Sequence, residues 1–157
     1  MSIKSYQMTF QGEVLVRGFW LYVWEIVSGN NRYFYVGRTG DSSSAHAASP
    51  FNRIGQHLDF RENAKGNSLA KRLNEVGINP RTCNFRMLAL GPFFPEQATF
   101  DKHKPFRDQM ATFEFELANY LKTEGCNVLG SHHIGSTVDN EILSDVKSQV
   151  LDFISRP

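Results

Sequence analysis

The chain has few of the features that mark a secreted or membrane protein. Its 157 residues include only two cysteines, Cys83 and Cys126, which are too few for a disulfide framework. No uncharged apolar run reaches the roughly 18 residues that a membrane span needs, and we expect no signal peptide. We therefore predict a cytoplasmic protein with no membrane partner.

An excess of charge of one sign is also lacking. The chain carries 17 Lys and Arg against 16 Asp and Glu, a formal net charge of +1, so only a local basic patch could attract nucleic acid. With 41% hydrophobic residues and no internal repeat, the composition is typical of one globular domain. We predict a single domain over residues 1–157, with its core at about 18–130.

Three segments have the aromatic and β-branched character of strands. Residues 19–27 and 32–38 flank the sequence Ser-Gly-Asn-Asn, which predicts a β-hairpin. Residues 85–90 form a further short apolar run that ends at a Gly-Pro pair. An earlier run, residues 8–16, could add a strand at the edge of the sheet.

Four segments have helical signals. Ser49 followed by proline predicts a helix over about 50–58, and leucines at helical spacing predict another at about 68–76. A long apolar stripe predicts a helix over 106–123, and a last amphipathic helix is expected at about 140–154. The expected fold class is α+β, a small central antiparallel sheet of about three strands flanked by helices.

Several polar side chains fall together in this arrangement. Strand alternation allows Tyr22 and Tyr35 to meet across the hairpin. Arg53 and His57, four residues apart, share one helix face. The ordinary interpretation of the two tyrosines is that of sheet aromatics whose hydroxyl groups reach water. The ordinary interpretation of the other pair is a solvent-exposed helix face.

Two further sets are less decisive. Glu114 and Glu116 fall on opposite borders of the apolar stripe, so periodicity alone leaves open which one reaches a cleft. His132 and His133 lack a third ligand at regular spacing, so we assign them no role.

The order of these pieces over about residues 20–127 resembles the GIY-YIG nuclease family. The family's first signature triplet corresponds to residues 20–22, where Tyr22 keeps the tyrosine and Trp20 replaces the glycine. The second triplet corresponds to residues 35–37, where Tyr35 and Gly37 keep the tyrosine and the glycine. On the expected first helix, the segment from Arg53 to His57 is similar to the family's arginine-then-histidine pattern. Glu114, three residues before a leucine, and Asn127 beyond the helix are similar to its metal-binding glutamate and structural asparagine.

The resemblance implies a GIY-YIG-like fold and a divalent-metal-dependent DNA endonuclease, of restriction type because one domain fills the chain. It implies that Glu114 holds Mg²⁺ or Mn²⁺ and that Gly37 and Asn127 give structural support. We expect DNA contacts from Arg38 and, in the locally basic stretch between residues 53 and 86, from Lys71 and Arg72. The implied catalytic residues are Tyr22, Tyr35, Arg53, His57 and Glu114.

The expected partners are DNA and a second copy of the chain, since no separate DNA-binding domain is left to supply specificity. Two alternatives have the same fold: a nucleic-acid-binding module that has lost cleavage, and a nuclease of structured DNA or RNA. A third alternative is a protein-interaction domain that uses the aromatic N-terminal half as an interface.

Overall fold

The computed structural model describes residues 1–135 and 137–156. Its centre is a three-stranded antiparallel sheet of order β2-β1-β3, formed by β1 (Phe19–Ser28), β2 (Asn31–Arg38) and β3 (Asn84–Phe94). The predicted α+β class with a small antiparallel sheet is confirmed.

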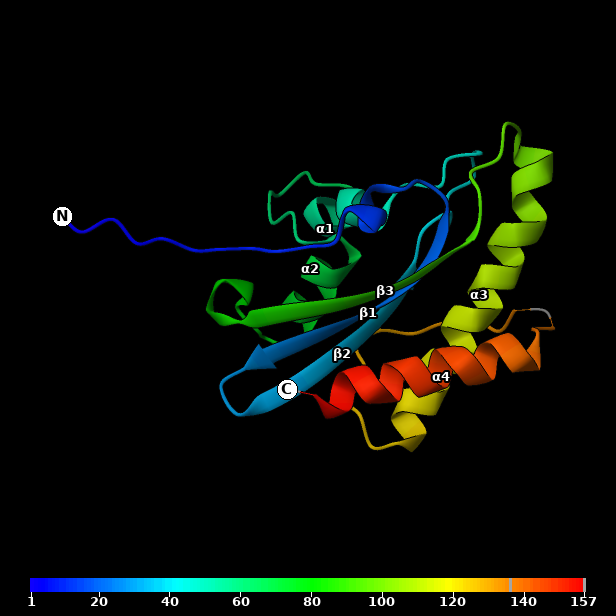
Figure 1. The fold of residues 1–157 in the computed structure, drawn as a ribbon. Coiled ribbons are helices and arrows are strands. Elements are labelled where there is room, and N and C mark those ends of the chain that lie inside the picture. The colour runs from blue at the N-terminus through cyan, green and yellow to red at the C-terminus, as the bar shows by residue number, and fades with distance from the viewer. Residues whose placement is uncertain (136, 157) are drawn as a thin grey trace.

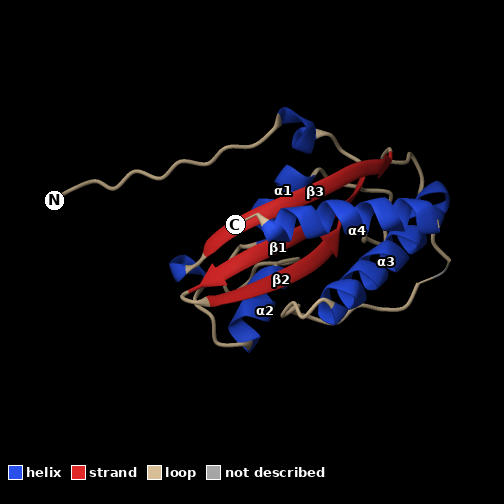
Figure 2. Ribbon diagram, turned by 60° about the horizontal axis from the view of Figure 1, so that its bottom comes forward, coloured by secondary structure: helices blue, strands red, loops and turns tan. Residues whose placement is uncertain are grey.

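Helices cover both faces of this sheet (Figures 1 and 2). One face packs against α1 (Pro50–His57) and α2 (Ser68–Glu75), and the other against α3 (Phe100–Thr123) and α4 (Asn140–Ser155). Two short 3₁₀ helices, η1 (Gly12–Leu15) and η2 (Pro80–Thr82), precede β1 and β3. In the described part of the chain, no helix is both long and apolar enough to cross a membrane.

The β1–β2 hairpin forms as predicted. Ser28 pairs with Asn31, and Gly29 between them has φ +57°, a conformation that suits glycine in a tight hairpin turn. The third strand is longer than predicted, because the Gly-Pro pair lies inside it. Phe19 pairs with Phe94 but Leu21 with Leu90, so Gly91 and its neighbours form a bulge instead of ending the strand.

Two other expectations were wrong. Residues 8–16 do not form an edge strand: the described structure has only η1 there, preceded by an extended, exposed segment. The long helix begins at Phe100, six residues earlier than expected. His103 explains this extension, because its buried ring contacts Phe19 and its Nε2 lies 2.8 Å from the Gly40 carbonyl oxygen.

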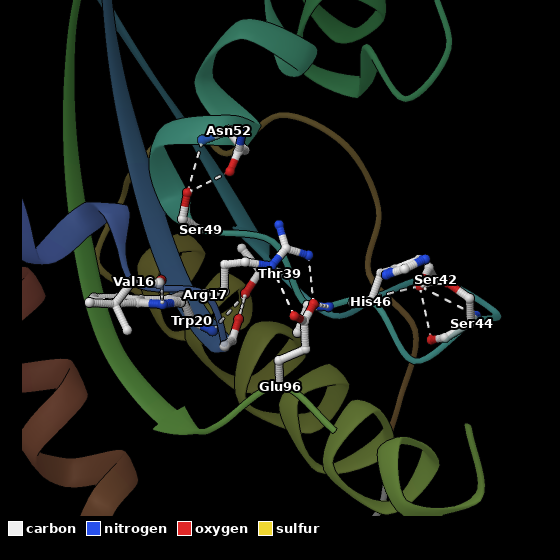
Figure 3. Close-up of polar contacts among 12 residues, drawn as sticks. Val16, Arg17, Trp20, Thr39, Ser42, Ser44, His46, Ser49, Asn52 and Glu96 are labelled. Atoms are coloured by element: carbon white, nitrogen blue, oxygen red, sulfur yellow. Dashed lines mark hydrogen bonds and ion pairs between the residues drawn. The ribbon is translucent and has the colours of Figure 1, made fainter. Parts of the chain in front are cut away.

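The start of β1 is fixed by Trp20 (Figure 3). Its backbone N–H donates to Thr39 Oγ1 at 2.8 Å, and its indole Nε1 donates to the Val16 carbonyl at 3.0 Å. Nearby, Ser49 caps α1 as predicted, accepting from the N–H of Asn52 at 3.3 Å. Trp20 thus holds the segment before the sheet to β1.

The face covered by α3 and α4 buries a carboxylate beside its apolar core. Glu25, 3% exposed, accepts hydrogen bonds from Arg32 and Arg86. The same two arginines donate to the carbonyls of Ile154 and Phe153 at 2.8 and 3.1 Å. Glu25 therefore orients two cations that satisfy the C-terminal end of α4.

Candidate active site

The site is built on the face of the sheet that α1 and α2 cover, beginning with Tyr22. This fully buried residue pairs with Gly37 across the hairpin. A Cβ added to Gly37 would lie 2.5 Å from the Tyr22 ring, far inside van der Waals contact. Glycine is therefore required at this position of the second triplet because the tyrosine ring occupies the space of a side chain.

His57, at the end of α1, joins the two tyrosines. Its Nε2 lies 2.5 Å from the Tyr22 hydroxyl oxygen. The imidazole packs edge-on to both rings, with centroid distances of 5.5 Å to Tyr22 and 5.6 Å to Tyr35. The Tyr22 hydroxyl also lies 3.2 Å from the Arg38 carbonyl oxygen, to which it can donate. The predicted meeting of the tyrosines across the hairpin thus includes a histidine between them.

Arg53 lies one helical turn before His57 and is nearly buried, with 12% of its side chain exposed. Its Nη1 donates to Gln56 at 2.5 Å and its Nη2 to Asp41 at 3.2 Å. Within the described residues, its Nε is buried and has no hydrogen-bond partner. The guanidinium therefore keeps a donor available beside the tyrosines.

Glu114 reaches the same region from α3. Its Oε2 accepts from Arg38 Nε at 2.9 Å, and it shares a cavity with Tyr35. Burial raises the pKa of Glu114 to about 7, although the charges of Arg38 and Arg53 lower it in part. Of the two glutamates that periodicity left open, Glu114 is the one that reaches this cavity.

The remaining titratable groups are shifted mainly by burial. It raises the pKa of Tyr22 well above its usual range and that of Tyr35 to about 12. It lowers the pKa of His57 to about 4, and the Arg53 charge lowers it further. At neutral pH both phenols are protonated and the imidazole is neutral.

Arg53 is the charged group that acts on all of these side chains. Its charge contributes to the pKa of four side chains, those of Tyr22, Tyr35, His57 and Glu114. The other four residues singled out as catalytic therefore lie around the Arg53 guanidinium. They come from the β1–β2 hairpin, α1 and α3.

Other predicted site residues lie in different places. Asn127 is exposed, and its backbone carbonyl accepts from the Phe34 N–H at 2.8 Å. Its structural contact, at the edge of β2, is therefore made by the backbone. Arg38 and Arg72 line the cavity beside Glu114, whereas Lys71 is exposed on α2 and does not line it.

The sequence missed one part of the site. The cavity, about 120 Å³, is also lined by His132 and His133, to which the sequence gave no role. His132 Nε2 lies 3.1 Å from the Val36 carbonyl oxygen. No local pattern could have found this, because the loop reaches the site only through the packing of α3 beside β2.

The residues fit a divalent cation only in a restricted way. Among residues 1–135 and 137–156, no three His, Cys, Asp or Glu side chains gather closely enough to form a metal site by themselves. Glu114 is a buried carboxylate with a raised pKa, and its bond to Arg38 uses Oε2 alone. Such a group suits Mg²⁺, which keeps several waters and can be held by one carboxylate together with substrate phosphate.

Comparison with known proteins gives no relative: no protein-family model, curated protein or solved structure matches the chain. The fold and the geometry described above are therefore the basis for any function.

Proposed function

We propose that this protein is a GIY-YIG-like, divalent-metal-dependent endonuclease that hydrolyses phosphodiester bonds in DNA. The observation that carries the proposal is the gathering of two tyrosines, a neutral histidine and a buried carboxylate around Arg53. Phosphodiester hydrolysis needs an activated water, stabilised charge on the phosphate and a proton for the leaving oxygen. Each need has a matching group in this cluster.

Arg53 would hold the scissile phosphate. The exposed part of its guanidinium can donate to a non-bridging oxygen, and its fixed charge stabilises the charge that develops in the transition state. The ion pair with Asp41 holds the guanidinium in place. Lysine lacks the planar fork of donors, so it would replace Arg53 poorly.

Tyr22 and His57 would accept the proton of the attacking water. The water gives its proton to the phenol oxygen while the phenol proton passes to His57 Nε2, 2.5 Å away. The products of this step are hydroxide bound to phosphorus, neutral Tyr22 and a charged imidazole. His57 is neutral at pH 7 in the resting site, so its Nε2 carries the lone pair that accepts this proton. Tyr35 packs against the ring and limits its movement.

Glu114 would hold the metal, which supplies Lewis acidity toward the phosphate when it is bound. The carboxylate must be ionised to bind a cation, and its pKa of about 7 makes this ionisation sensitive to pH near neutrality. Arg38 holds the carboxylate in position through Oε2.

The choice of DNA as the substrate rests on the resemblance of residues 20–127 to the GIY-YIG nuclease family. One domain with a net charge of +1 has little surface for extended, non-specific binding. We propose that a second copy of the chain supplies part of the recognition surface. Discrete cleavage products would support this interpretation. A preference for branched DNA or for RNA would instead favour a nuclease of structured DNA or RNA.

The decisive experiment incubates the purified protein with plasmid DNA and Mg²⁺ or Mn²⁺, beside an EDTA control. Arg53→Ala should lower the cleavage rate by about 100-fold or more, the loss usual for a group that stabilises transition-state charge. Arg156→Ala is the matched control, because this exposed arginine pairs with Asp152 on α4, away from the cluster. Cleavage that survives EDTA or Arg53→Ala contradicts the proposal.

A protein that shifts DNA in a gel but cleaves under no metal condition would be the binding module instead. In that case Arg53→Ala should weaken the shift, while Arg156→Ala leaves it unchanged.

A further inference from the structure

The cavity beside Glu114 has a strongly polar lining that the hydrolytic steps do not use. It opens between β2, α2, α3 and the loop at 130–133, and we call it the Arg72 pocket. Its volume of about 120 Å³ is enough for several water-sized groups. The polar side chains that line it, besides Tyr35 and Glu114, are Arg38, Ser68, Arg72, Ser131, His132 and His133.

Donors in this pocket lack partners. Arg38 uses its Nε for Glu114, and within the described residues its Nη1 is buried with no hydrogen bond. Arg72 contacts Glu75 through Nη1 at 3.0 Å in an ion pair that is largely exposed, and it also lines the pocket. A buried guanidinium donor without an acceptor is costly, so Arg38 favours an anionic or oxygen-bearing ligand here.

The N-terminus of α2 meets the same pocket. Ser68, its first residue, lines the pocket one helical turn before Arg72. In the described structure the Asn67 side chain makes no capping bond; its amide donates to the Asp59 carbonyl at 2.9 Å instead. The first turn of α2 therefore presents uncapped N–H groups and the positive end of the helix dipole next to two arginines.

Neighbouring groups do not cancel this positive character. The one carboxylate in the lining, Glu114, is neutralised by its bond to Arg38. His132 is fixed by its contact with the Val36 carbonyl, so it forms a wall of the pocket without adding charge. The pocket thus combines the free Nη1 donor of Arg38, the partly exposed guanidinium of Arg72, two hydroxyls and a helix N-terminus, a set suited to a phosphate group.

We propose that the Arg72 pocket binds a second phosphate of the nucleic-acid strand, the one next to the phosphate held by Arg53. This inference rests on the proposed function, since Tyr35 and Glu114 belong to both sites. A contact to a second phosphate fixes the direction in which the nucleic-acid strand crosses the cluster. It also aligns the scissile bond with Tyr22 before the reaction.

The first test measures binding of inorganic phosphate by NMR at pH 7 with EDTA present, using the Arg53→Ala protein so that the catalytic phosphate position is disabled. Arg72→Ala should weaken phosphate binding about tenfold, the usual effect of losing one charge-assisted hydrogen bond. Ser68→Ala, which removes a hydroxyl and keeps a good helix former, should weaken it less. Arg156→Ala is the matched control, and the far-ultraviolet circular dichroism of each variant reports folding.

The second test uses duplexes in which one phosphate at a time is replaced by a neutral methylphosphonate. With the wild-type protein, substitution should weaken binding at two adjacent positions, and Arg72→Ala should remove the effect at one of them. Phosphate binding that ignores both Arg72→Ala and Ser68→Ala, or a single sensitive position, overturns the second phosphate site while leaving the nuclease intact. Phosphate binding through Arg72 in a protein that never cleaves DNA would retain the pocket and remove the nuclease.

Discussion

The two faces of the sheet each bury a glutamate, and they treat it in opposite ways. On the face under α3 and α4, burial would raise the pKa of Glu25, but hydrogen bonds from Arg86 and Arg32 outweigh it and the pKa is lowered. In the cavity at the edge of the other face, Glu114 has one arginine partner, and burial raises its pKa to about 7. A fully paired carboxylate maintains structure, whereas a partly paired one keeps capacity for a ligand.

The same contrast extends to the other polar groups. The arginines that bind Glu25 also donate to backbone carbonyls of α4, so these charged groups have partners within the protein. In the described residues around Tyr22, buried polar atoms without partners remain on Arg38, Arg53 and His57. Buried groups of this kind cost stability, and natural proteins retain them mainly where a ligand or a reaction uses them.

The largest expected effect separates the two glutamates by function. Glu114→Gln should lower metal-dependent cleavage by about 100-fold or more, because an amide binds Mg²⁺ poorly and cannot balance its charge. The free energy of unfolding should not fall, since the substitution removes a carboxylate that burial destabilises. Cleavage kinetics and urea denaturation of one preparation check both parts, and a stable protein with wild-type cleavage would remove Glu114 from the site.

Glu25→Gln should have the opposite profile. It removes the negative charge and one of the two acceptor oxygens that Arg32 and Arg86 share, and it loosens the end of α4. Because both arginines are partly exposed, we expect a loss of about 2–3 kcal/mol in the free energy of unfolding. Cleavage at a temperature well below the unfolding midpoint should change little. If Glu25→Gln removed activity without loss of stability, the two carboxylates would not differ as described.

Gly37→Ala tests whether the second triplet needs glycine for space. The new methyl would collide with the Tyr22 ring, and we expect a loss of about 1–3 kcal/mol with cleavage reduced as the phenol moves from His57. Gly55→Ala on α1 is the control, because nothing lies within 4 Å of its added Cβ. That substitution should be neutral or stabilising. Equal effects of the two substitutions would contradict the steric explanation.

The dependence of stability on pH sharpens the comparison further. Glu114 has a higher pKa folded than unfolded, so between about pH 4.5 and 7 the native state binds more protons and loses stability as pH rises. Glu114→Gln lacks this loss. Its stability relative to wild type should therefore increase by about 1–2 kcal/mol across that range, measured by urea denaturation with EDTA. His57, whose lowered pKa acts in the opposite direction, is common to both proteins and cancels.

The smallest expected effect concerns Asn127. Because its side chain is exposed and its structural contact is made by the backbone, Asn127→Ala should change the free energy of unfolding by less than about 0.5 kcal/mol. Cleavage should stay within about twofold of wild type, a change of under 0.5 kcal/mol in the barrier. A large loss of activity would instead give the Asn127 side chain a part in supporting the site.

Much of the fold was predictable because local signals dominate it. The hairpin follows from aromatic and β-branched runs around a glycine turn, and α1 from Ser49 and the proline after it. The errors came where packing overrides such signals. His103, buried against Phe19, makes residues 100–105, including Pro105, part of the long helix, and β3 continues past Gly91 through a bulge.

By itself, the sequence determined the hairpin, its alternation and the spacing of Arg53 and His57, because these depend on periods of two and of 3.6 residues. It also supplied the order of residues on which the nuclease interpretation rests. Only the tertiary structure decided that Glu114 reaches the cavity, that Asn127 stays outside it, and that Arg72 and the loop at 130–133 complete a pocket. These contacts join residues from separate elements, and the packing of helices on a sheet is not encoded in any local pattern.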